Sequence, residues 1–227
     1  MTQPFDWEKV VTNTWDQHAV DWDERSQRMW EYGSRKKIIP FIQAHVKEGS
    51  HVLDVGSGSG YGSLKLHQSG YRVLGVDISE EMIRLANKYR KGDALTFKQG
   101  DVCNLSFLDQ TFDAIMSINV LEWTKTPVKA LSELTRILKQ DGLLCVGILG
   151  PTAGPRGHSY RRLYGEDVIQ NTMMPWEFLQ LAKEHHYDLV ACEMVWKKEM
   201  NQFNPTSLPY QMQQALAFMS VFMLQKK

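Results

Sequence analysis

The residues with the clearest chemical potential form a glycine-rich stretch, HVLDVGSGSG, at residues 51–60. The apolar run over 52–55 contains β-branched residues and predicts a buried parallel strand. Gly56, Gly58 and Gly60 follow at once, so the backbone is expected to turn sharply without side-chain cover. A strand, a bare turn and a helix N-terminus form a place where a nucleotide-like ligand can approach main-chain N–H groups closely.

The elements that must position this turn alternate along the chain. Short apolar runs predict strands at 51–55, 72–77, 95–99, 112–118 and 143–149. Helical patterns fall at about 60–69, 80–90, 127–139 and 175–185. Two last strands, 188–196 and 215–224, are expected to pair antiparallel, because only a polar loop at 199–211 separates them. The alternation predicts an α/β fold with a mostly parallel sheet and helices on both faces.

Three polar residues reinforce the glycine turn. Asp77, Asp101 and Asn119 each stand at or just past the carboxyl end of a predicted strand. Right-handed crossovers bring these strand ends to one edge of a parallel sheet, where ligands bind. The sequence therefore predicts one crevice to which four separate segments contribute.

The first 48 residues have a helical pattern with a tryptophan repeat. Tryptophans recur at intervals of 8, 7 and 8, which keeps them on one helical face, at positions Trp7, Trp15, Trp22 and Trp30. This stripe either packs onto the main domain or forms a lid whose aromatic side chains wall a substrate pocket, or does both. Ser34 is expected to cap a second helix over about 35–46, with Pro40 causing a kink or a short first turn.

These patterns suggest an N-terminal helical cap at 1–48 and a main domain at 49–227. Within the main domain, 150–175 reads as a substrate-side insertion that begins with a loop at 150–157 without an element of its own.

Composition narrows the function classes. Lys and Arg together number 26, as do Asp and Glu, so the formal net charge is zero, which argues against nucleic acid as the main partner. Cys103, Cys145 and Cys192 lie far apart, outside any metal-binding spacing, and are expected to be buried thiols in a reducing compartment. No signal peptide or membrane-spanning run is evident, so the default expectation is a cytoplasmic protein without a metal.

The glycine spacing distinguishes between ligands. The dinucleotide fingerprint is G-x-G-x-x-G, and Tyr61 stands where its third glycine would be, which disfavours an NAD-binding oxidoreductase. The run VLDVGSGSG instead resembles motif I of class I S-adenosylmethionine (SAM) dependent methyltransferases. The resemblance continues, in order, through GVDIS at 75–79, QGDV at 99–102, FDAIMSINVLEW at 112–123 and LTRILKQDGLL at 134–144. Within that family, the sequence is similar to the small-molecule methyltransferases of the ubiquinone/menaquinone-biosynthesis type.

The resemblance implies a Rossmann-like, seven-stranded sheet with an antiparallel last strand. It also implies a SAM site made of Asp54, Gly56, Ser57, Gly58, Gly60, Asp77, Ile78, Asp101, Val102, Asn119 and Val120. In that site Asp77 would accept from the ribose hydroxyls, and Asp101 would accept from the adenine amine. Asp54 and the Asn119 carbonyl would hold the amino group. Either Arg35 or Tyr32 is a candidate to reach the carboxylate of SAM.

The methyl acceptor and any general base are not evident in the sequence. Glu122, His158 and Tyr160 lie in segments expected to border the pocket, and Trp123 stands where relatives often carry histidine. The arginines Arg156, Arg161 and Arg162 either receive an acidic substrate group or form a solvated basic loop. The sequence thus predicts methyl transfer to a small molecule, with a SAM-binding protein without catalysis as the alternative, and it leaves open a monomer or a homodimer.

Overall fold

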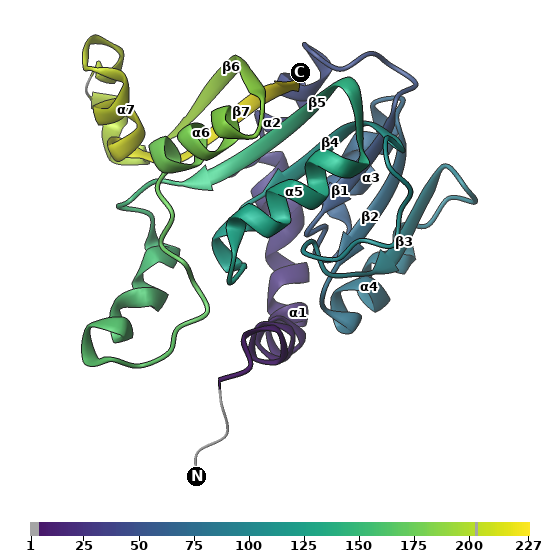
Figure 1. Cartoon of the computed structure of the whole chain (residues 1–227), viewed down its shortest axis with the longest axis horizontal. Helices are drawn as coiled ribbons and strands as arrows, with labels where there is room; N and C mark the ends of the chain where they lie inside the picture. Colours follow the sequence, from purple (N-terminus) through teal and green to yellow (C-terminus); the bar gives the residue numbers. More distant parts are fainter. Residues whose placement is uncertain (1–4, 203) are drawn as a thin grey trace.

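The structure, a computed structural model, describes residues 5–202 and 204–227. These residues form one seven-stranded sheet in the order β3-β2-β1-β4-β5-β7-β6 (Figure 1). Its strands are β1 (His51–Val55), β2 (Arg72–Asp77), β3 (Leu95–Gln99), β4 (Phe112–Ile118), β5 (Leu138–Leu149), β6 (Tyr187–Trp196) and β7 (Ala217–Lys226). The first five pair in parallel, and β7 is antiparallel to both β5 and β6. The predicted Rossmann-like fold with an antiparallel last strand is confirmed.

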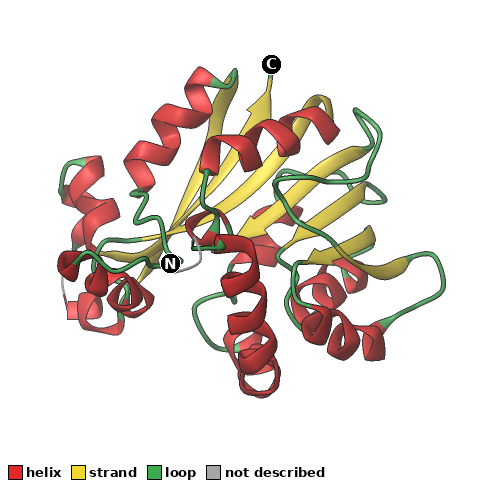
Figure 2. Ribbon diagram, turned by 60° about the horizontal axis from the view of Figure 1, so that its bottom comes forward, coloured by secondary structure: helices red, strands yellow, loops and turns green. Residues whose placement is uncertain are grey.

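Helices cover both faces of this sheet (Figure 2). The α-helices are α1 (Trp7–Glu31), α2 (Ile38–Gln43), α3 (Tyr61–Gln68), α4 (Glu80–Ala86), α5 (Pro127–Ile137), α6 (Pro175–Glu184) and α7 (Tyr210–Leu216). The 3₁₀ segments are η1 (Asn87–Tyr89), η2 (Leu121–Trp123), η3 (Gly154–Tyr164), η4 (Lys198–Gln202) and η5 (Pro205–Ser207).

The two-residue period of the strands divides the core into two layers. In β4, Ile115 packs on the face covered by α5 and α6, whereas Ala114 and Met116 pack on the face covered by α2 and α3. Because β4 and β5 are buried on both faces, they read as continuous apolar runs in the sequence. This double cover holds the carboxyl ends of the strands in fixed positions.

Helix α1 lies across those strand ends and is bound to the main domain at several points. The indole Nε1 of Trp7 donates to the carbonyl of Trp123 at 2.9 Å. Near the middle of the helix, the Ser79 hydroxyl donates to Asp16 at 2.5 Å. At its far end, Glu31 accepts from the Tyr61 hydroxyl at 2.7 Å. Because these contacts are spread along its length, α1 forms a fixed wall over one edge of the sheet.

Five local expectations were wrong, the first being the start of the fifth strand, which is Leu138 rather than residue 143. The second helix covers only α2 and begins after Lys37 rather than at a Ser34 cap, because 34–37 form turns. The loop at 150–157 runs into η3, and the supposed polar loop at 199–211 holds η4, η5 and the start of α7. The last strand also begins two residues later than expected, since α7 extends to Leu216.

Three findings bear on broader expectations. No helix among residues 5–202 and 204–227 is long and apolar enough to cross a membrane. The same residues contain no cluster of three or more His, Cys, Asp or Glu side chains that could hold a metal ion. All three cysteines are free thiols, of which Cys145 is buried and the other two are partly exposed.

We expect Gly62→Ala to lower the free energy of unfolding by about 1–2 kcal/mol, measured by urea denaturation. A Cβ at Gly62 would lie 2.3 Å from Cζ2 of Trp30, whose indole is buried between α1 and α3. This overlap outweighs the helix propensity that alanine gains over glycine. The matched control is Gly157→Ala, where a Cβ meets nothing within 4 Å, and its stability should stay within about 0.5 kcal/mol of the parent. Equal stability of the two variants would show that the Trp30 contact is not tight.

Candidate functional site

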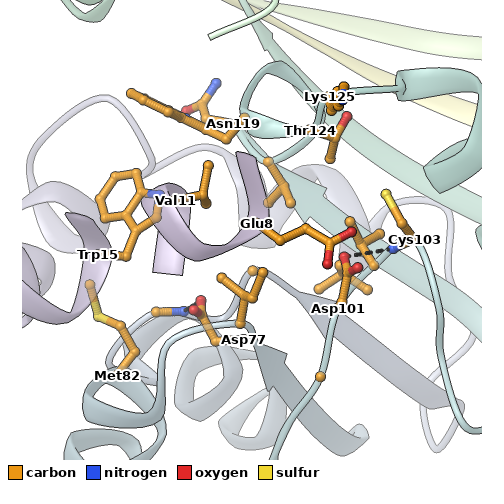
Figure 3. A pocket seen from close by; sticks show the side chains of 18 of the residues that line it. Glu8, Val11, Trp15, Asp77, Met82, Asp101, Cys103, Asn119, Thr124 and Lys125 are labelled. Carbon is orange, nitrogen blue, oxygen red and sulfur yellow. Dashed lines mark hydrogen bonds between the residues drawn. The ribbon is translucent and has the colours of Figure 1, made fainter. Parts of the chain in front are cut away.

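A cavity of about 340 Å³ lies between α1 and the carboxyl ends of β1, β2 and β4 (Figure 3). Its size is typical of small-molecule sites. The described residues that line it include eight of those expected at the SAM site: Gly56, Gly58, Asp77, Ile78, Asp101, Val102, Asn119 and Val120. The predicted convergence of four segments on one crevice is therefore present in the structure.

The glycine turn is shaped by close packing. Gly56 and Gly58 have φ of 67° and 54°, a region that favours glycine. A Cβ at Gly56 would lie 2.2 Å from a methyl carbon of Val120, and one at Gly58 would lie 2.7 Å from Nε1 of Trp22. The N–H of Gly56 already donates to Val76, at 2.7 Å, and that of Gly58 donates to Asp77. The absence of side chains therefore lets Val120 and Trp22 pack against the turn, and the N–H groups of Gly56 and Gly58 are not free donors.

Asp77 stands at the end of β2 with its carboxylate on the cavity wall. Its Oδ2 accepts from the Gly58 N–H at 2.8 Å, and its Oδ1 accepts from the Ser79 N–H at 3.0 Å. Burial raises the pKa of Asp77 to about 6, although these two hydrogen bonds oppose the rise. A carboxylate has about four lone-pair sites, so two remain for a ligand.

Asp101 and Asn119 mark two other edges of the cavity. The Asp101 carboxylate accepts from the N–H of Cys103 at 2.9 Å, the bond drawn in Figure 3. Asn119 follows β4 with φ of 57°, a left-handed conformation that asparagine tolerates better than most residues. Its N–H donates to Gly147 of β5 at 2.9 Å. This strained turn after β4 is typical of residues held in place for a ligand.

Three of the expected site residues do not line the cavity: Asp54, Ser57 and Gly60. Asp54 alternates with Leu53 and Val55 along β1, so its side chain points toward α3, where it accepts from the Ser63 hydroxyl at 2.6 Å. Ser57 keeps a buried hydroxyl without a hydrogen-bond partner among the described residues. Gly60 caps the start of α3 with φ of 85°. Their proposed contacts with SAM stay predictions.

Arg35 lines the cavity, whereas the other candidate for the SAM carboxylate, Tyr32, is 81% exposed and does not. The Arg35 side chain is only 9% exposed and forms no hydrogen bond or ion pair with any described residue. Its guanidinium carbon lies 4.9 Å from the ring centre of Trp22 and 5.5 Å from that of Trp30. Burial lowers its pKa to about 10, so it keeps its positive charge at neutral pH. It is a buried cation that faces a cavity.

The tryptophan stripe of α1 is divided between the cavity and the core, and its role as a wall of a substrate pocket stays a prediction. Trp7, Trp15 and Trp22 line the cavity, and Trp30 packs into the core. Trp15 meets Trp22 edge to face at 5.5 Å and Trp123 of η2 at 5.2 Å between ring centres. One side of the cavity is therefore an aromatic wall built from α1 and η2.

None of the three candidate bases lines the cavity. Glu122 is fully buried below it and accepts from the Leu149 N–H at 2.7 Å, and burial raises the pKa of this carboxyl. His158 packs against Trp123 with 6.2 Å between ring centres, and Tyr160 is half exposed.

The three arginines of η3 also lie away from the cavity. Arg156 is buried and donates to the carbonyls of Leu149 and Met173, at 2.6 and 2.5 Å. Arg161 pairs with Glu166, and Arg162 donates to the Ser159 carbonyl. None of these candidate bases and arginines is among the described residues that line the cavity.

Sequence reasoning missed several lining residues, among them Met82, Cys103, Thr124, Lys125 and Lys129. A usable signal existed for the first two. Met82 lies one turn after the Ser79 cap, and Cys103 directly follows the motif at 99–102.

The comparisons with known proteins identify the domain. Residues 53–146 match the family model described as "Methyltransferase domain". Over these residues the chain is similar to methyltransferases. It is 31% identical over 153 residues to the demethylmenaquinone methyltransferase of Symbiobacterium thermophilum, covering 61% of this chain and 59% of that protein. It is also 31% identical over 157 residues to the malonyl-[acyl-carrier protein] O-methyltransferase of Pectobacterium atrosepticum, covering 67% of this chain and 60% of that protein.

The chain spans about half to three fifths of the length of the curated relatives it matches. Solved structures show the same fold. The SAM-dependent methyltransferase from Methanosarcina mazei has a TM-score of 0.65 at 23% identity, covering 82% of this chain and 97% of that chain. The 1,6-didemethyltoxoflavin-N1-methyltransferase of Burkholderia thailandensis has a TM-score of 0.68 at 16% identity, covering 100% of this chain and 93% of that chain.

We expect the contribution of Asp54 to the stability of this protein to fall as pH rises from about 4 to about 7. Burial raises the pKa of Asp54 to about 7 in the folded protein, whereas its unfolded value is about 3.9. The folded state therefore binds the extra proton, and its advantage is lost as pH rises through 7. In urea denaturation, the midpoint of Asp54→Asn relative to that of the parent should be higher at pH 8 than at pH 5.

The matched control is Asp113→Asn. The Lys139 ion pair lowers the pKa of Asp113, so this carboxylate is ionised at both pH values. Its substitution should lower the midpoint by a similar amount at pH 5 and pH 8. A pH-independent effect of Asp54→Asn would contradict the assignment of the raised pKa to Asp54.

Proposed function

We propose that this cavity binds SAM and that the protein transfers its methyl group to a small-molecule acceptor. The observation that carries the proposal is the charge pattern of the cavity. A buried guanidinium without a partner, a carboxylate with two unused lone-pair sites and a side-chain-free turn all meet there. SAM offers the complementary groups: a carboxylate, a ribose diol and an extended aminoacyl chain that needs close backbone approach.

The ribose and adenine are assigned to the ends of β2 and β3. Asp77 would accept from the ribose hydroxyls with its two unused lone-pair sites. Ile78 and Val102 line the cavity and would pack on the adenine, with the Val102 N–H directed to its ring. Asp101 uses Oδ1 on Cys103, which leaves Oδ2 for the exocyclic amine.

The aminoacyl end is assigned to the side of the cavity beneath α1. The Asn119 carbonyl and Asp54 would hold the amino group, and the turn at Gly56 and Gly58 would lie against the chain. Arg35 would bind the carboxylate, because a buried cation without a protein partner is stabilised by a bound anion. Its stacking on Trp22 and Trp30 holds the guanidinium in place before the ligand arrives.

The catalytic role proposed for this chain is positioning. SAM supplies an electrophilic methyl group on a sulfonium, and a nucleophile held in line with it needs little further help. Orientation of this kind can contribute up to ~7–11 kcal/mol in favourable cases. We assign the acceptor side to the cap at 1–48 and the segment 150–175, with the main domain at 49–227 holding SAM.

Isothermal titration calorimetry with S-adenosylhomocysteine (SAH) and with SAM tests the proposal. We expect both to bind one site at micromolar concentrations, and labelled SAM incubated with a small-molecule extract to yield labelled product. Binding without transfer would indicate a SAM-binding protein that is not an enzyme. No binding of either compound at high micromolar concentrations would refute the proposal.

The proposed roles of Arg35 and Asp77 can be distinguished with a ligand that lacks the aminoacyl end. We expect Arg35→Met to weaken SAH binding by about tenfold or more, since a charged hydrogen bond is lost from a buried site. Binding of 5′-methylthioadenosine, which has no carboxylate, should be unchanged in this variant. Asp77→Asn should weaken the binding of both ligands. Retained 5′-methylthioadenosine binding also shows that Arg35→Met is folded, and equal losses for both ligands would contradict the carboxylate assignment.

A further inference from the structure

The part of the cavity that the proposed SAM contacts leave free is mainly aromatic. Trp7 and Trp15 of α1 and Trp123 of η2 line it, together with Val11. The Trp7 indole N–H is already bonded to the Trp123 carbonyl, so this side chain presents carbon to the cavity. Such a wall favours a flat apolar molecule, because aromatic faces and edges pack on one another in offset or edge-to-face contacts.

Of the ionisable groups that line the cavity, Asp77, Asp101 and Arg35 are assigned to SAM, and Lys129 is exposed. Among the described residues that line it there is no histidine or tyrosine. Burial raises the pKa of Cys103 to about 11, so it is a neutral thiol at physiological pH. Glu8 and Lys125 are exposed at the mouth of the cavity, with Glu8 directed toward Asp101 (Figure 3). No side chain is placed to remove a proton from a molecule held against Trp15.

We propose that the acceptor is a planar, apolar molecule whose nucleophilic atom is already anionic when it binds. This inference rests on the proposed function. The acceptor class comprises acidic aromatic hydroxyls, enols and thiols, and it leaves out simple alcohols and protonated amines, which require a base.

The step balances without a proton. The anionic atom of the acceptor forms a bond to the methyl carbon, the bond from that carbon to sulfur breaks, and its electron pair stays on sulfur. The positive sulfonium and the negative acceptor become two neutral products, SAH and the methylated acceptor. Because charge disappears along this path, a wall of indoles disfavours the separated ions more than the transition state. The aromatic wall thus serves the chemistry as well as the binding.

The test uses two planar probes of different acidity, 2-naphthol and 2-naphthalenethiol, and one non-planar probe, cyclohexanethiol. Transfer of labelled methyl from SAM is measured from pH 5.5 to pH 10. We expect log(kcat/KM) to rise with a slope of one and to level at the pKa of each planar probe, so that the break moves with the acceptor. A break at one shared pH for both planar probes would reveal an enzyme base and overturn the proposal.

The aromatic wall is tested with variants of Trp15. Trp15→Ala should raise the KM for 2-naphthalenethiol at least tenfold, and Trp15→Phe should stay within about threefold of the parent. Cyclohexanethiol should have at least a tenfold higher KM than 2-naphthalenethiol with the parent protein. Trp176→Phe, on α6 away from the cavity, is the matched control and should change neither value.

SAH titration of every variant separates the two proposals. If the parent binds SAH but methylates neither planar probe, or if Trp15→Ala leaves the KM unchanged, the acceptor class is wrong while the SAM site stands. If the parent does not bind SAH, the proposed function fails and this inference fails with it.

Discussion

The structure depends on the contact between α1 and the glycine turn. Trp22 can lie against Gly58 only because that position has no Cβ, and the Arg35 guanidinium lies over the same indole. Trp22 thus contacts both the glycine turn and a cation at the cavity. Charged groups are costly to bury without partners, and the buried carboxyls of Asp54 and Glu122 offset this cost for Arg35 only in part. The SAM carboxylate proposed to bind Arg35 would add a direct partner.

Burial also sets the electrostatics beneath the cavity. Asp54 and Asp77 both have raised pKa values, of about 7 and 6, because water is excluded from the carboxyl ends of β1 and β2. Arg35 offsets this in part, since its charge favours the ionised form of Asp54. The site therefore contains groups whose charges are poorly satisfied by the protein alone, which is typical of functional sites.

The sequence predicted the sheet well because buried parallel strands and glycine turns leave local signals, as at residues 51–60. It predicted the tryptophan face of α1 from its spacing, but not which tryptophans meet the cavity, which depends on packing between distant segments. The same limit applied to Arg35, which lies in a turn and is packed against two indoles of α1. Helix α7 was missed because its polar sequence, YQMQQAL, lacks an apolar period, and η3 was missed because its glycines and prolines resemble a loop.

A crystal structure of the protein with SAH tests the central claim most directly. The account predicts that SAH lies in the cavity with its ribose hydroxyls on Asp77, its carboxylate within hydrogen-bond distance of the Arg35 guanidinium and its sulfur facing Trp15. SAH bound elsewhere, or bound in the cavity with its carboxylate away from Arg35, would contradict it.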